Sequence, residues 1–133
     1  MKDDLYPFPI LGAAGEALTA TECTEKCLGY AQEAATEARL AIVNAREYVT
    51  KDFTHTFGAL TVAFERRVAM HSWVHFARGY HTVAIAWEAM STTRSYEVVM
   101  ALQALESEGD VMSENAEAVA KRLGASAPAE ACR

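Results

Sequence analysis

Two histidines and two arginines near the middle of the sequence form the strongest candidate for a chemical site. They follow one another at intervals of four, four and three residues and are named here the His/Arg stripe: Arg67, His71, His75 and Arg78. Residues at these intervals share one face of a helix. Two histidines one turn apart can place both imidazoles on a single transition metal, although a metal site in a helical bundle needs further ligands from a facing helix.

Two glutamates could supply those ligands if the chain folds back on itself near residue 54. Residues equidistant from that reversal lie level on two antiparallel helices, so Glu33 would lie level with His75, and Glu37 with His71. The Glu-x-x-His spacing of di-iron bundles is absent, however, and arginines border the histidines. We therefore expect the stripe to face solvent or a partner protein with no cofactor, and we keep one bound transition metal as the alternative.

A second possible metal site combines two cysteines and a histidine. Cys23 and Cys27 share a helical face, and the same reversal places Cys27 level with His81. Two thiolates and an imidazole could bind Zn²⁺ or Cu⁺. Strong zinc signatures pair two such motifs, and cysteine is commonly a small buried apolar residue. The odd number of cysteines, three, does not predict a disulfide framework, so we expect a reducing compartment.

Enzymatic function finds little support in the other motifs. The sequence contains no glycine-rich phosphate loop, no Gly-x-Ser-x-Gly elbow and no Cys-x-x-Cys-His haem attachment motif. Arg66 and His71, five residues apart, could hold and protonate a phosphodiester, but such a spacing recurs often by chance. We therefore expect a protein that is not an enzyme.

Composition narrows the class of protein. The net charge of −6 over 133 residues comes from acids mixed with bases, which argues against a general affinity for nucleic acid. Two acids and two prolines near the N-terminus differ from the layout of a signal peptide. The most apolar segment, 68–90, contains three histidines, an arginine and a glutamate, so it predicts no membrane span. A cytoplasmic protein of one domain is expected.

Helical periodicity dominates the sequence and predicts an all-α fold. Thr19 to Glu22 fits a capping box, which marks the start of a helix. Apolar residues then recur every three or four positions over about 20–52 and again over about 56–91. The first seam is rich in alanine and the second in aromatic residues, so the two long helices can pack closely as an antiparallel hairpin.

Two shorter helices are expected to complete the bundle. Apolar spacing predicts them over about 95–107 and 112–123, with a break at Gly109 and Asp110. The predicted helical-bundle domain then covers residues 19–124.

The chain ends flank this domain with an extended apolar arm at 1–18 and a tail at 125–133. Prolines keep the arm extended, and its apolar side chains would be costly to leave in water, so they are expected to lie on the bundle or on another subunit. The predicted contact residues of the arm are Tyr6, Phe8, Ile10 and Leu11. Together with the His/Arg stripe, they predict a protein that associates with itself, as a dimer or larger assembly, or with another protein.

Overall fold

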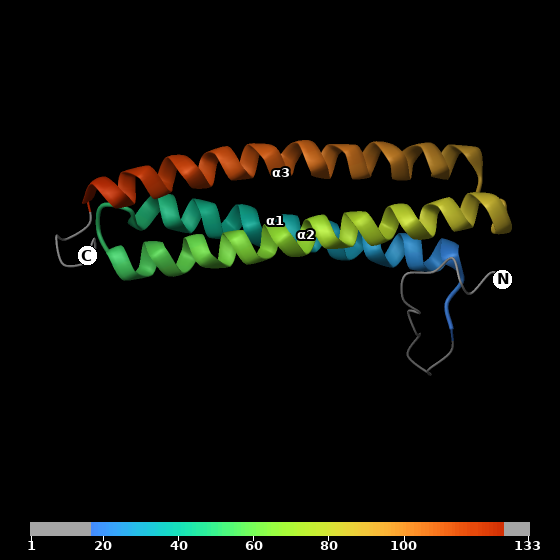
Figure 1. Ribbon diagram of the computed structural model, residues 1–133, viewed down its shortest axis with the longest axis horizontal. Helices are drawn as coiled ribbons and strands as arrows, with labels where there is room; N and C mark the ends of the chain where they lie inside the picture. Colours follow the sequence, from blue (N-terminus) through green and yellow to red (C-terminus); the bar gives the residue numbers. More distant parts are fainter. Residues whose placement is uncertain (1–16, 127–133) are drawn as a thin grey trace.

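The computed structural model describes residues 17–126, and within this range the protein is a bundle of three long helices (Figure 1). The helices are α1 (Ala20–Tyr48), α2 (Phe53–Glu88) and α3 (Thr92–Ser126). The prediction of an all-α fold is confirmed. The arm residues Tyr6, Phe8, Ile10 and Leu11 lie outside the described residues, and α3 includes the first two residues of the predicted tail.

The capping box predicted at the start of α1 is present. The Thr19 hydroxyl accepts a hydrogen bond from the Glu22 amide, and the Glu22 carboxylate accepts one from the Thr19 amide, both at 3.1 Å. α1 ends at Tyr48 rather than near residue 52, because the amides of Lys51 and Asp52 both donate to the Tyr48 carbonyl and turn the chain. Asp52 then caps α2 by accepting a hydrogen bond from the His55 amide at 3.0 Å.

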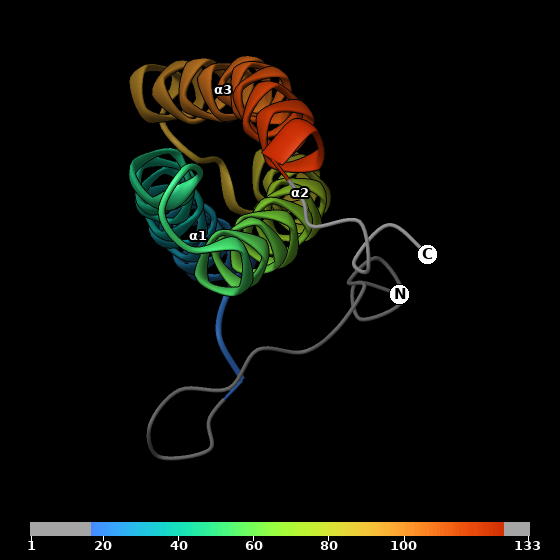
Figure 2. The ribbon, with the colours of Figure 1, turned by 90° about the vertical axis from the view of Figure 1, so that its left-hand side faces the viewer.

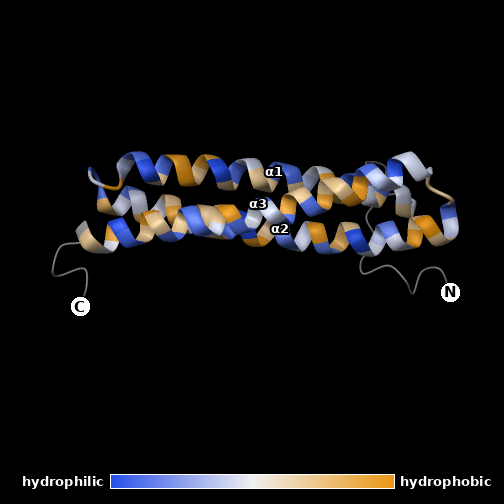
Figure 3. Ribbon diagram, turned by 90° about the horizontal axis from the view of Figure 1, so that it is seen from above, coloured by the Kyte–Doolittle hydropathy of each residue, from blue (hydrophilic) through white to orange (hydrophobic). Residues whose placement is uncertain are grey.

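The core lies mainly between α1 and α2, where small side chains on α1 face larger ones on α2. The fully buried alanines of α1 are Ala20, Ala31, Ala35, Ala38 and Ala45. They let the two backbones approach closely, while Met70, Val74 and Tyr80 of α2 supply volume. The aromatic seam of α2 fills less of the core than expected, because Trp87 is 61% exposed. Figure 3 shows hydrophobic and hydrophilic residues alternating along each helix.

α3 is one continuous helix, so the prediction of two shorter helices separated at Gly109 and Asp110 is wrong. Gly109 is buried, and a Cβ atom on it would lie 2.8 Å from Met70 Cε and 2.9 Å from two ring atoms of His71. The glycine therefore permits close approach of α3 to α2 instead of ending a helix. α3 runs along the length of the hairpin (Figure 1), and the end view in Figure 2 shows the three helices around a shared core.

Candidate functional site

Three ion pairs between arginine and glutamate join α3 to the hairpin. They are Arg39 with Glu108, Arg78 with Glu106, and Arg94 with Glu25. The hydrogen bond from Arg94 lowers the pKa of Glu25, and that from Arg78 lowers the pKa of Glu106. Each pair is largely exposed and contributes little to stability alone. Together they link α3 to both other helices, to α1 through Arg39 and Glu25 and to α2 through Arg78.

The His/Arg stripe faces α3 over most of its length. Arg78 forms an ion pair with a glutamate of α3, and this hydrogen bond raises the pKa of Arg78. His71 lies against Gly109 of α3, and Arg67 lines a groove between α2 and α3. His75 is exposed. Contacts within the chain therefore engage three of the four residues, and a role in binding a partner stays a prediction.

The predicted metal ligands do not gather into a site within the part of the chain that the structure describes. Glu33 and Glu37 are exposed on α1, and no three His, Cys, Asp or Glu side chains among residues 17–126 are placed to hold a metal ion. Cys23 and Cys27 are buried free thiols. Burial raises the pKa of the Cys27 thiol to about 11, and the neighbouring Cys23 adds to this rise. Such a thiol resists the deprotonation that metal binding requires.

His81, the third member of the predicted cysteine site, is buried on α2 and contacts the start of α3. Its Nε2 atom lies 2.9 Å from the Ser95 hydroxyl oxygen. Burial lowers the pKa of His81 below its usual value, so the neutral imidazole is favoured. The pair places one polar contact between α2 and the start of α3, which is a structural role.

Glu88 is an important residue that the sequence analysis missed. Its carboxylate accepts hydrogen bonds from the Ala20 amide at 2.9 Å, the Thr21 amide at 2.8 Å and the Thr21 hydroxyl at 2.9 Å. A negative charge at this position satisfies free amides and is stabilised by the helix dipole. The sequence could have indicated this contact, because a reversal of the chain near residue 54 places residue 88 level with residue 20.

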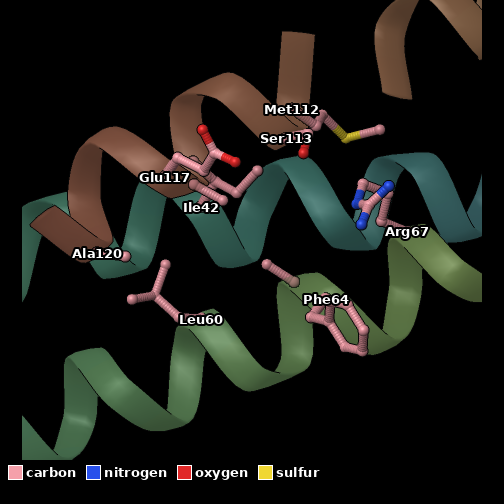
Figure 4. A pocket seen from close by; sticks show the side chains of 10 residues that line it. Ile42, Leu60, Phe64, Arg67, Met112, Ser113, Glu117 and Ala120 are labelled. Atoms are coloured by element: carbon pink, nitrogen blue, oxygen red, sulfur yellow. The ribbon is translucent and has the colours of Figure 1, made fainter. Parts of the chain in front are cut away.

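A groove of about 330 Å³ opens between α2 and α3, one helical turn beyond the close contact at Gly109 (Figure 4). Its walls are mostly apolar or small side chains, with one arginine and one glutamate. The lining consists of Ile42 from α1, of Leu60, Ala63, Phe64 and Arg67 from α2, and of Met112, Ser113, Ala116, Glu117 and Ala120 from α3. The small side chains of α3 leave this space unfilled.

Arg67 and Glu117 lie across the groove in the register of an ion pair. Arg67 precedes Arg78 by eleven residues, and Glu117 follows Glu106 by eleven residues. Eleven residues are just over three turns of an α-helix, so both positions return to the faces that form the Arg78–Glu106 pair. Among residues 17–126, Arg67 nevertheless has no ion-pair partner, and its guanidinium carbon lies 5.8 Å from the centroid of the Phe64 ring.

Two clusters stand out among the exposed large apolar side chains, which also include Tyr30, Leu40, Val43, Val62 and Val111. Phe57, Phe64 and Val68 share the outer face of α2 and are 60%, 60% and 44% exposed; we call them the α2 ridge. A second cluster surrounds the turn between α2 and α3 and comprises Ile85, Trp87, Tyr96, Val99 and Met100. Apolar surface therefore remains uncovered after the three helices have packed.

Hydropathy gives no sign of a membrane segment, since none of the helices described in residues 17–126 is long and apolar enough to cross a membrane. Comparisons of this chain with protein-family models, with curated proteins and with solved structures found no match.

Proposed function

We propose that this chain is a non-catalytic helical protein that acts by protein–protein association, as a subunit of an oligomer or larger assembly or as a small regulator or inhibitor. The observation that carries this proposal is the α2 ridge. Phe57, Phe64 and Val68 recur at seven and four residues, and all three are exposed. Aromatic side chains are enriched at protein interfaces, and two Phe rings largely in water on one helix face are a costly arrangement for a monomer.

The spacing of the α2 ridge suits a helical partner. Apolar residues at intervals of seven and four residues form the seam along which a second helix packs. His75 lies seven residues after Val68 on the same face and is exposed, so this member of the His/Arg stripe extends the ridge. α3 is held on a neighbouring face of α2 by its ion pair with Arg78, which leaves the ridge available.

Native mass spectrometry and sedimentation over a wide range of protein concentration test this proposal. The wild-type chain is expected to form a defined oligomer. Phe57→Lys or Val68→Lys should weaken association by about tenfold or more, because a charge replaces an apolar contact at the centre of the interface. Val111→Lys is the matched control, since Val111 is 53% exposed on α3 and lies outside the ridge.

Two outcomes would contradict association of this chain with itself through the α2 ridge. A wild-type mass of one chain at every concentration would exclude the oligomer, and equal effects of the ridge variants and Val111→Lys would exclude the ridge as the interface. The same spectra report bound metal, so a stoichiometric metal ion would instead favour the metal-binding alternative.

A further inference from the structure

The groove between α2 and α3 has the size and composition of a small-ligand site. Its volume of about 330 Å³ lies at the lower end of the range for small-molecule pockets, about 300–1,000 Å³. Ile42 forms part of its lining from α1, and Leu60, Ala63 and Met112 add apolar surface. A mostly apolar lining with few polar groups is typical of pockets in which the polar groups orient the ligand.

Arg67 is the cation of this site, and it differs from the arginines that join the helices. Arg39, Arg78 and Arg94 each have a glutamate partner on another helix. Arg67 is partly buried beside apolar side chains, and its guanidinium group lies over the ring of Phe64. Figure 4 shows its side chain reaching from α2 toward α3. A guanidinium placed in this way keeps its fork of N–H donors available for a carboxylate.

The size of the groove favours a small ligand over a helix of a partner protein. One turn of an α-helix with its side chains is a cylinder about 10–12 Å wide and 5.4 Å long, or roughly 400–600 Å³. That volume exceeds the groove, which could accept only one or two side chains of such a helix. A single chain of methylene groups ending in a carboxylate satisfies both the apolar lining and the cation.

We infer that the groove binds a small monocarboxylic acid with an apolar body, such as a medium-chain fatty acid. The carboxylate accepts hydrogen bonds from the Arg67 guanidinium, and the hydrocarbon chain lies against Ile42, Leu60 and Ala63. Glu117 stands on the opposite wall and repels a second negative charge, so the site selects a monoanion over a dicarboxylate. The groove shares Phe64 with the α2 ridge, but Arg67, Glu117 and the remaining lining residues lie outside the ridge.

Titration of the full chain with decanoate, below the concentration at which it forms micelles, tests the inference by calorimetry. Amide chemical shifts locate the bound ligand, and those of Leu60 and Ala116 are expected to move most. Arg67→Gln should weaken binding by about tenfold or more, because a charged hydrogen bond is lost. Arg66→Gln removes the adjacent arginine, which does not line the groove, and should leave the affinity unchanged.

Two further comparisons measure how much the charge of the ligand carboxylate contributes to binding. Decanol, which has the same hydrocarbon chain without the charge, should bind about tenfold or more weakly than decanoate to the wild-type chain. Glu117→Gln should bind decanoate more tightly, because the opposing charge is gone. The inference is overturned if decanoate does not bind, if decanol binds as tightly, or if Arg67→Gln and Arg66→Gln bind decanoate equally well.

Discussion

The interface between α2 and α3 has a closed half and an open half. In the closed half, Gly109 lets Met70 and His71 of α2 approach the backbone of α3. In the open half, Ala116 and Ala120 line a groove. Both halves present small residues on α3, but in the closed half side chains of α2 reach the space beside the α3 backbone, whereas in the open half that space stays unfilled. A small residue produces a close contact where a large partner fills its space, and a groove where none does.

The ion pairs differ between the halves in the same way. Arg78 and Glu106 meet in the closed half, whereas Arg67 and Glu117, three turns away in equivalent register, remain separate. Sequence register therefore places the charges correctly in both halves.

The largest expected effect comes from adding a side chain at Gly109, where the neighbours are already in close contact. Gly109→Leu should lower the free energy of unfolding by about 2–3 kcal/mol, because even its Cβ would lie under 3.0 Å from Met70 and His71. Gly29→Leu is the control, since no atom lies within 4 Å of a Cβ there and a helix former replaces glycine. Urea unfolding measures both variants. If both variants lost the same free energy of unfolding, the close contact of Gly109 with Met70 and His71 would not explain the loss.

A smaller effect of opposite sign is expected in the open half. Ala116→Leu should raise the free energy of unfolding by about 1 kcal/mol, because the added apolar atoms enter the groove and leave water. Ala35→Leu, at a fully buried position of α1, should instead lower it by about 1–3 kcal/mol through overpacking. Thermal unfolding distinguishes the two. A lower free energy of unfolding for both Ala116→Leu and Ala35→Leu would mean that the groove cannot accept a larger side chain.

The smallest effect concerns the two glutamates that occupy equivalent register. Glu106→Gln should lower the free energy of unfolding at pH 7 by less than about 1 kcal/mol, whereas Glu117→Gln should leave it unchanged. The pKa of Glu106 is lowered in the folded chain, chiefly by the hydrogen bond from Arg78, so its contribution is complete above the usual value of 4.5. It is lost as the pH falls through the lowered pKa.

Unfolding measured from pH 7 downward checks this sign. The difference in free energy of unfolding between the wild-type chain and Glu106→Gln should shrink as the pH falls below about 4.5. It should vanish once Glu106 is protonated. A difference that stays constant with pH would indicate that the glutamate acts through packing and not through its charge.

Local features of this fold were predictable because they depend on neighbouring residues. The capping box of Thr19 and Glu22 follows from a spacing of three, and the helical seams follow from periods of three and four. Gly109 was misread because glycine favours helix ends and close contacts alike, and only the facing residues Met70 and His71 decide between them.

The candidate site was less accessible from the sequence. Spacing correctly placed Arg67, His71 and Arg78 on one side of α2, but it could not show that α3 covers that side. The groove depends on how side-chain sizes match between residues of α2 and α3 that lie about fifty positions apart along the chain. No periodicity within one helix contains that information.

The contact of Glu88 with the start of α1 has a consequence for the order in which the fold is completed. It spans 68 residues, so a chain synthesised from its N-terminus makes α1 long before the carboxylate that binds its first turn. Until α2 is finished, that turn has only its own capping box to prevent fraying. Once Glu88 has docked, the first turn of α1 and the last turn of α2 open together, and they should exchange their amide hydrogens as one cooperative unit.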